Sequence, residues 1–155
     1  KPFDAEGLPN GKKYLAENGV LTTWVLDLAS ARQLELESTG NAARSTASPP
    51  SPAVTNLFME AGDKSPTELI SDINNGFYVT ELIGMGINMV TGDYSRGAAG
   101  FWIENGEISY PVTEITIAGN LKDMFANLVP ADDLEFKSGI DAPTLRIDGM
   151  TVAGS

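Results

Sequence analysis

Short runs of apolar and β-branched residues alternate with turn residues along this chain, a pattern typical of strands joined by tight turns. Two Asn-Gly pairs, Asn18-Gly19 and Asn105-Gly106, lie between such runs. Because Asn and Gly tolerate positive φ at both central positions of a type I′ turn, each pair predicts a β-hairpin. The expected strands are residues 13–16, 20–26, 55–60, 77–83, 87–90, 99–104, 107–110, 112–118, 144–147 and 150–152.

Helix signals are few and short. Ser65-Pro66-Thr67-Glu68 combines an N-cap serine, a proline at the first helical position and the glutamate of a capping box, which predicts a helix from Pro66 to about Asn75. A second helix is expected over 121–128 behind Asn120, since its apolar residues recur at helical spacing. A third short helix is expected over 28–34.

Proline and glycine predict where regular structure stops. Three prolines within 48–52 favour an extended surface loop. Gly84 and Gly86 indicate a bend or bulge, and Pro111 is expected to interrupt its strand. The pattern as a whole predicts an α+β fold, mainly antiparallel β, as a folded sheet or barrel-like, with two or three short helices.

Length and charge narrow the function classes. At 155 residues the chain has the length of a single domain, and none of its apolar runs approaches the ~20 residues that span a bilayer. The formal charge is −11, so the surface repels phosphate backbones. We therefore expect no direct nucleic-acid partner and no membrane insertion.

The chain contains no histidine and no cysteine. It thus lacks the commonest zinc ligands and the usual general base at neutral pH. Ser95 has no histidine to activate it, and Asp132, Asp133 and Asp141 are interpreted as solvated loop carboxylates rather than a catalytic pair. We expect no catalytic residue, no metal ligand and no cofactor within this chain.

The glycine-rich run from Gly92 to Gly100 invites two interpretations. It fails the P-loop pattern and precedes no predicted helix. Its glycines are consistent with a tight turn or bulge in which neighbouring charges pair locally. Alternatively, Asp93, Tyr94, Ser95, Arg96 and Gly97 line a substrate cleft or a subunit interface, because Tyr and Arg are frequent interface anchors.

Four apolar side chains near this run are also expected to be covered, either by the core or by another subunit. Met85, Met89, Phe101 and Trp102 occupy strand-like positions and are expected to fill the core or a subunit seam, not a cofactor site.

The same run, GDYSRGAAGFWIENGEI at residues 92–108, resembles the carboxyl-terminal domain of the TldD/PmbA family, and within it the PmbA (TldE)-like subunits. The similarity continues through KPFDAEGLP at 1–9, STGNA at 38–42, YVTELIG at 78–84, AGNL at 118–121 and MTVAG at 150–154. Two departures stand out. Asn41 occupies a position where the family pattern often has histidine, and LEFKSGID at 134–141 lacks the cysteine that TldD-type subunits carry there.

The resemblance implies that residues 1–155 form one carboxyl-terminal domain of a longer protein whose amino-terminal domain precedes Lys1. It implies a non-catalytic subunit of a cytoplasmic TldD/TldE-type metallopeptidase complex acting on unfolded or modified peptides, with zinc on a TldD-like partner. Self-association is a further expected mode of assembly. Two other readings stay open, namely a self-sufficient metallopeptidase with an upstream HExxxH motif and a free-standing peptide-binding module.

Overall fold

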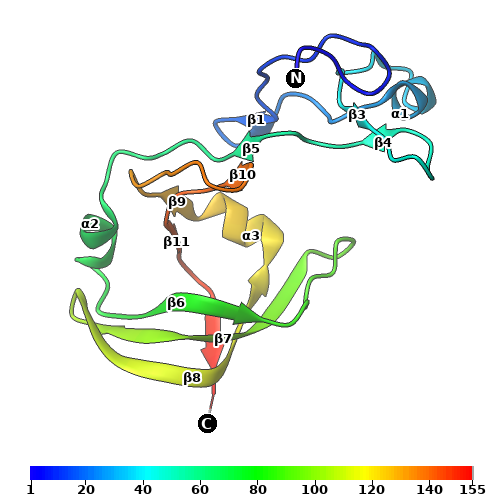
Figure 1. The fold of residues 1–155 in the computed structure, drawn as a ribbon. Coiled ribbons are helices and arrows are strands. Elements are labelled where there is room, and N and C mark those ends of the chain that lie inside the picture. Colours follow the sequence, from blue (N-terminus) through cyan, green and yellow to red (C-terminus); the bar gives the residue numbers. More distant parts are fainter. Residues whose placement is uncertain (155) are drawn as a thin grey trace. The chain divides into compact units, whose positions relative to one another are not determined.

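The computed structural model describes residues 1–154, which group into two compact units (Figure 1). The first unit comprises Lys1–Phe58 with Ser138–Ile140, and the second comprises Met59–Lys137 with the segment that begins at Asp141. Each unit has its own strands and stabilising contacts. The single-domain organisation expected over 1–155 stays a prediction.

The first unit is built from very short strands and one helix. Its elements are β1 (Ala16–Glu17), β2 (Val20–Leu21), α1 (Leu28–Gln33), β3 (Ala42–Ala43), β4 (Ser51–Pro52) and β5 (Leu57–Phe58), with β10 (Ile140–Asp141) beside β5. β1 pairs antiparallel with β2 around Asn18 (φ 51) and Gly19 (φ 78), which confirms the first predicted hairpin in a shorter form. β3 and β4 form a second antiparallel pair.

Two aspartates organise the loops of the first unit. One Asp4 oxygen accepts from the N–H groups of Glu6 and Leu8, and the other accepts from Ala42 N–H at 2.9 Å. Asp27, only 2% exposed, is the N-cap of α1 and accepts from Ser30 N–H at 2.7 Å. Because a unit with so few long strands leaves many backbone N–H groups unpaired, these carboxylates replace the missing ladder bonds.

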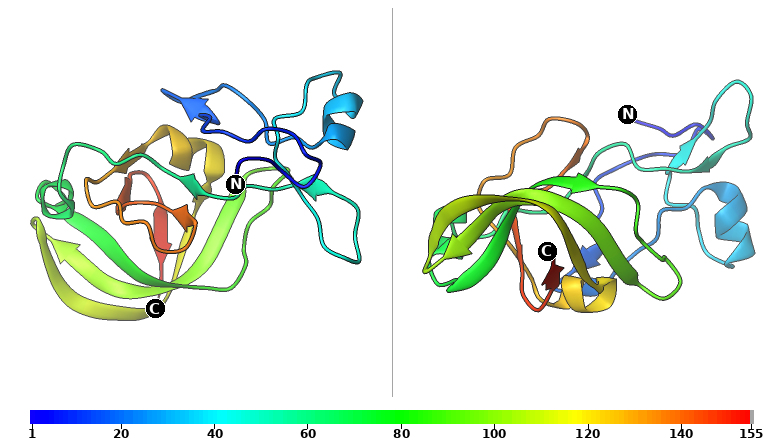
Figure 2. Two further views of the ribbon diagram at one scale, coloured as in Figure 1. Left: turned by 45° about the horizontal axis from the view of Figure 1, so that its top comes forward. Right: turned by 90° about the horizontal axis from the view of Figure 1, so that it is seen from below.

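The second unit contains the one long sheet among the described residues. Its elements are α2 (Pro66–Ile70), β6 (Asn75–Ile83), β7 (Asp93–Glu104), β8 (Glu107–Asn120), α3 (Leu121–Ala126), β9 (Leu128–Pro130), β11 (Leu145–Ile147) and β12 (Thr151–Ala153). The sheet has the order β12-β8-β7-β6 with every pair antiparallel, and β9 pairs separately with β11. Figure 2 shows this sheet bent into a cradle around the segment that joins β11 to β12.

Bulges account for the bend. Val79 pairs with Gly100 and Glu81 pairs with Ala99, so Thr80 is an extra residue on β6. A second irregularity lies on β8, where Glu114 adopts a φ of 57. Bulges increase local twist. The sheet keeps two open edges within residues 1–154, so the α+β class with three short helices is confirmed as a folded sheet rather than a closed barrel.

The core of the second unit lies on the concave face of the sheet. Ala98, Ile115 and Ile117 are buried there, and they are covered by the partly buried side chains of Phe77, Tyr94, Val112 and Met150. The capping box of α2 is present, because Ser65 Oγ accepts from Glu68 N–H while the Glu68 carboxylate accepts from Ser65 N–H.

Helix α2 ends at Ile70, several residues before the Asn75 that the sequence predicts. The hairpin turn after β7 competes for its last residues, since Asn105 N–H donates to Asn74 C=O and Gly106 N–H donates to Ile73 C=O. Helix α3 ends at Ala126, and Leu128 instead enters β9 opposite Ile147. Both predicted helices were therefore too long, because strand pairing took over their ends.

Two strand predictions were also wrong. Pro111 lies inside the continuous strand β8, opposite Phe101. β12 pairs only with Thr116–Ala118, so the missing N–H of Pro111 faces an unpaired side of β8, where proline is tolerated. Residues 87–90 do not form a strand, because Ile87 makes one bridge and Gly92 N–H then closes a turn onto Asn88 C=O.

Candidate functional site

The predicted residues Asp93–Gly97 form the start of β7 and not a tight turn. Side chains alternate between the faces of a strand, so Tyr94 and Arg96 share the concave face while Asp93, Ser95 and Gly97 lie on the other. The register agrees, since Arg96 is opposite Ile117 and Tyr94 packs against the buried cluster. The five residues therefore contribute to two surfaces, and only two of them reach the cradle.

Asp93 has a structural role at the end of the β6–β7 loop. Its carboxylate accepts from Thr91 Oγ1 at 2.7 Å, and Asn120 Nδ2 donates to Thr91 C=O at 3.1 Å. Gly92, with φ 83, accepts at its carbonyl from Leu121 N–H. The local pairing of Asp93 with Arg96 that one interpretation expected is not formed, because residues three apart in a strand point to opposite faces.

Arg96 lies on the concave face with a donor to spare. Its Nη2 donates to Leu82 C=O at 3.3 Å, whereas its Nε is buried and has no partner among the described residues. An unmatched N–H of a guanidinium attracts carboxylate or carbonyl oxygens. Whether this group serves a cleft or an interface stays a prediction, as do the roles of its four neighbours.

A cavity of about 480 Å³ occupies the cradle near the start of β6. It lies between α2, the first half of β6 and the segment 144–150. Most of its lining is apolar, from Leu69, Ile70, Ile73, Phe77, Val79, Trp102, Ile103, Ile117, Met150 and Val152. A hollow of this size and character is typical of a site for a small molecule or an apolar side chain.

Arg146 is the cation of this cavity, and its charge is already matched. Its Nε and Nη2 donate to the two Asp148 oxygens at 2.9 and 3.3 Å, while Nη1 donates to Asp72 Oδ1 and to Leu69 C=O. Hydrogen bonds to Asp148 and Asp72 raise the pKa of Arg146, and the bond from Arg146 lowers the pKa of Asp72. This clamp holds α2 to the segment that lines the other side of the cavity. Sequence reasoning missed it, because its two halves lie more than seventy residues apart.

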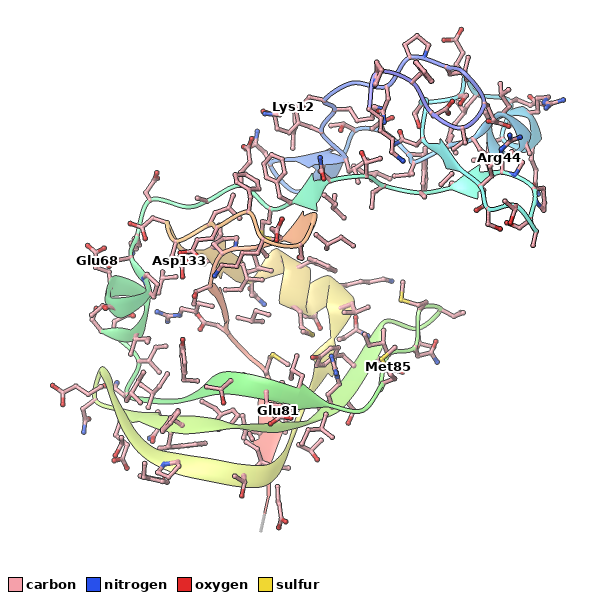
Figure 3. All side chains as sticks on the ribbon, viewed as in Figure 1. Lys12, Arg44, Glu68, Glu81, Met85 and Asp133 are labelled. Atoms are coloured by element: carbon pink, nitrogen blue, oxygen red, sulfur yellow. The ribbon has the colours of Figure 1, made fainter. Side chains whose placement is uncertain are left out.

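The β6–β7 loop carries apolar side chains that the cavity does not receive. Met85 and Met89 are 93% and 83% exposed, so they do not fill the core of this chain. Figure 3 shows Met85 near the β6 end of that loop, with Glu81 on β6. No charged residue occurs between Glu81 and Asp93. The alternative expectation, a subunit seam, stays a prediction for both methionines.

Two other polar positions have structural roles. Asp133 accepts from Thr144 N–H and from Thr144 Oγ1, at 2.8 and 2.7 Å, and these bonds lower its pKa. Asn41, 9% exposed, accepts from Lys13 Nζ at 2.8 Å within the first unit. Neither arrangement has the form of a catalytic pair.

The chain's donor set does not fit zinc. The sequence has neither histidine nor cysteine, and no three carboxylates within residues 1–154 are grouped so that they could hold a metal.

No helix in that described range combines the length and apolar character that a membrane span requires.

Comparison with known proteins gives a consistent picture. A family model for the PmbA/TldA metallopeptidase C-terminal domain matches residues 1–154. Metalloprotease PmbA of Escherichia coli O157:H7 is 44% identical over 154 residues, covering 99% of this chain and 32% of that protein. The Metalloprotease TldD homolog of Buchnera aphidicola subsp. Acyrthosiphon pisum is 27% identical over 170 residues, with coverages of 99% and 35%.

Solved structures agree with these sequence matches. TldE from Thermococcus kodakarensis superposes with a TM-score of 0.87 at 27% identity, covering 99% of this chain and 36% of that one. A putative modulator of a DNA gyrase from Thermotoga maritima MSB8 has a TM-score of 0.84 at 37% identity, with coverages of 99% and 35%. The chain spans about a third of the length of the curated relatives it matches.

Proposed function

Because the chain belongs to the PmbA/TldA metallopeptidase C-terminal domain family, we propose that it serves a PmbA (TldE)-like, non-catalytic subunit of a TldD/TldE-type complex. That complex would act in proteolysis and peptide maturation, on unfolded or modified peptides, in the cytoplasm. The domain would help to assemble the complex and to wall its substrate chamber.

The observation that carries this proposal is the absence of every histidine and cysteine from the chain. Zinc sites in proteins are built mainly from those two residue types. The TldD-like partner would therefore supply the metal and its ligands. The comparisons favour the PmbA side of the family, since identity is 44% to a PmbA protein and 27% to a TldD homolog.

Two surfaces of the second unit support a role in assembly and in the chamber. The loop between Glu81 and Asp93 is apolar and uncharged, as the centres of protein interfaces tend to be. Tyr94 and Arg96 lie on the concave face, beside the buried cluster of the second unit.

The name modulator of DNA gyrase, which the Thermotoga relative carries, does not require DNA binding by this domain. A formal charge of −11 opposes contact with a phosphate backbone. Any effect on DNA metabolism would then pass through a peptide or protein substrate.

Metal analysis tests the proposal. The full-length protein is purified alone and co-expressed with a TldD-type chain, and zinc is measured per subunit beside protease activity. We expect no stoichiometric zinc and no activity on the isolated subunit, and both in the co-purified complex. Stoichiometric zinc on the isolated subunit would instead indicate a self-sufficient metallopeptidase. Failure to co-purify, with peptide still bound, would indicate a free-standing peptide-binding module.

A further inference from the structure

The tripeptide Glu-Asn-Gly occurs twice in the chain, and both copies form the same kind of turn. Residues 17–19 lead from β1 to β2, and residues 104–106 lead from β7 to β8. Asn18 and Asn105 both have a φ of 51, and the glycines that follow them have φ values of 78 and 83. Sequence and backbone conformation therefore match at these residues, and the two copies differ in what surrounds them.

An Asn-Gly pair can undergo deamidation without an enzyme. The backbone nitrogen of the glycine attacks the side-chain carbonyl carbon of the asparagine, and a succinimide ring forms as ammonia leaves. Glycine favours this step because it has no Cβ to crowd the attacking nitrogen. In a folded protein the step also requires a glycine N–H that is free of hydrogen bonds and an asparagine that can leave its turn conformation.

The glycine of the first hairpin meets the first requirement. Gly19 N–H has no backbone acceptor among residues 1–154, and nothing lies within 4 Å of the position that a Cβ of Gly19 would take. Asn18 and Gly19 are both exposed. Water and a solvent base therefore reach the attacking nitrogen and the side-chain amide.

The first hairpin also meets the second requirement, because little holds it closed. The β1–β2 ladder consists of two residue pairs and one further backbone bond, from Thr22 N–H to Leu15 C=O at 2.9 Å. All four strand residues are exposed. A two-stranded hairpin of this kind is marginally stable in water, so its turn opens at a small cost in free energy.

The second hairpin meets neither requirement. Gly106 N–H, the attacking group, donates to Ile73 C=O at 2.8 Å, and Asn105 N–H donates to Asn74 C=O at 3.0 Å. A Cβ on Gly106 would meet the Ser71 carbonyl oxygen, so the turn is also packed closely. The strands on either side have 12 and 14 residues. Opening this turn requires breaking contacts to the segment before β6 as well as the end of a long ladder.

Two further Asn-Gly pairs, which begin at Asn10 and Asn75, are held by other contacts. Asn75 lies in the extended strand β6, and its Oδ1 accepts from Trp102 Nε1 at 3.3 Å. Asn10 N–H donates to Pro2 C=O at 3.1 Å, and its Oδ1 accepts from Lys13 Nζ at 3.4 Å. Both asparagines must break such contacts before their glycines can attack.

We propose that Asn18 is a site of spontaneous deamidation, with water as the co-reactant, and that the fold protects Asn105. A solvent base takes the proton of Gly19 N–H, the bond from Gly19 N to Asn18 Cγ forms, and the Cγ–Nδ2 bond breaks, so that Nδ2 leaves as ammonia with a proton from the solvent. Water then opens the ring. Cleavage at Cγ yields aspartate, and cleavage at the backbone carbonyl carbon yields isoaspartate. One water is consumed for each ammonia released.

The modification changes the hairpin in two ways. Either product adds a carboxylate beside Glu17, in a chain whose formal charge is already −11. Isoaspartate also inserts a methylene group into the main chain, which does not fit the two-residue turn that pairs Glu17 with Val20. The β1–β2 pairing is then lost with time in the first unit. This inference is independent of the proposed function.

The test compares the two hairpins within one molecule. Full-length protein is incubated at mildly alkaline pH, where the glycine nitrogen loses its proton more readily, and samples are digested with pepsin in acid. Mass spectrometry gives the fraction of each Glu-Asn-Gly peptide that has reacted. We expect Asn18 to react at least tenfold faster than Asn105 in the folded protein. In denaturing urea the two rates should agree within threefold, because the surrounding structure is gone.

The variant Asn18→Asp provides the control. Aspartate is also accepted at this position of the turn, and it has no amide nitrogen to release. In isoelectric focusing, the unmodified protein should move with time to the position of Asn18→Asp, while the variant should move at least tenfold more slowly. A variant that drifts as fast as the unmodified protein would overturn the assignment to Asn18.

The product at residue 18 tests the route. Isoaspartate, detected by its methylation with a protein isoaspartate methyltransferase, supports the succinimide, because direct hydrolysis of the side chain yields aspartate alone. Aspartate without isoaspartate would overturn the proposal, as would equal rates for Asn18 and Asn105 in the folded protein. A rate difference that persists in urea would also overturn it, since the difference would then come from the sequence and not from the fold.

Discussion

At the scale of single residues, close backbone approach decides which glycines are indispensable. A Cβ placed on Gly86 would lie 1.6 Å from Ser95 O, a backbone atom that cannot move aside without losing the bond from Ser95 N–H to Gly86 C=O. Gly86→Ala should therefore destabilise the protein by about 2 kcal/mol or more in urea unfolding. Gly11→Ala is the matched control, since nothing lies within 4 Å of its Cβ position. Equal effects of the two substitutions would contradict this account.

At the scale of elements, the sequence predicts a helix start or a turn correctly where all of its hydrogen-bonding partners lie within a few residues. Ser65 and Glu68 satisfy each other across one turn, so the start of α2 could be predicted. Ser65→Ala should cost about 1 kcal/mol of stability because it leaves the Glu68 N–H without its acceptor. The control Thr67→Ala, in the same helix, should be neutral by thermal unfolding. A neutral Ser65→Ala would show that other groups cap α2.

The predicted ends of helices and strands were wrong where the hydrogen-bonding partner lies on an element far away in the sequence. The end of α2 depends on the turn at Asn105, and the continuity of β8 through Pro111 depends on how short β12 is. The candidate site divides in the same way. The sequence singled out Asp93–Gly97 as a run of interest, but the division of that run between two faces follows from β7 being a strand. The clamp of Arg146 on Asp72 joins loops that no local pattern relates.

At the scale of the whole molecule, carboxylates stabilise the folded state through hydrogen bonds and also repel one another. Hydrogen bonds from Ser30, Thr144 and Arg146 hold the pKa values of Asp27, Asp133 and Asp72 below the ordinary range. A group with a lowered folded-state pKa stabilises above its unfolded pKa, about 4, and loses that contribution as the pH falls through its folded value. At neutral pH the net charge of −11 adds self-repulsion.

We expect the free energy of unfolding at pH 5 to equal or exceed its value at pH 7. Below pH 4 this free energy should fall steeply. Urea unfolding at dilute concentration measures it, since solubility should be lowest near the isoelectric point of 4.2. Asp27→Asn keeps a capping oxygen for α1 but removes one titrating group, so its stability should fall less steeply below pH 4. Identical acid profiles for both proteins would exclude Asp27 as a contributor.

The Arg146 clamp also sets an order of events during synthesis. The Leu69 carbonyl receives its guanidinium donor from a residue that leaves the ribosome 77 positions later. Until then α2 can form its capping box, but it lacks the guanidinium bonds that tie it to the segment at 144–150. The Arg146 bonds to α2 can therefore form only after residue 146 has emerged, and the nascent second unit must stay protected from aggregation and proteases until then.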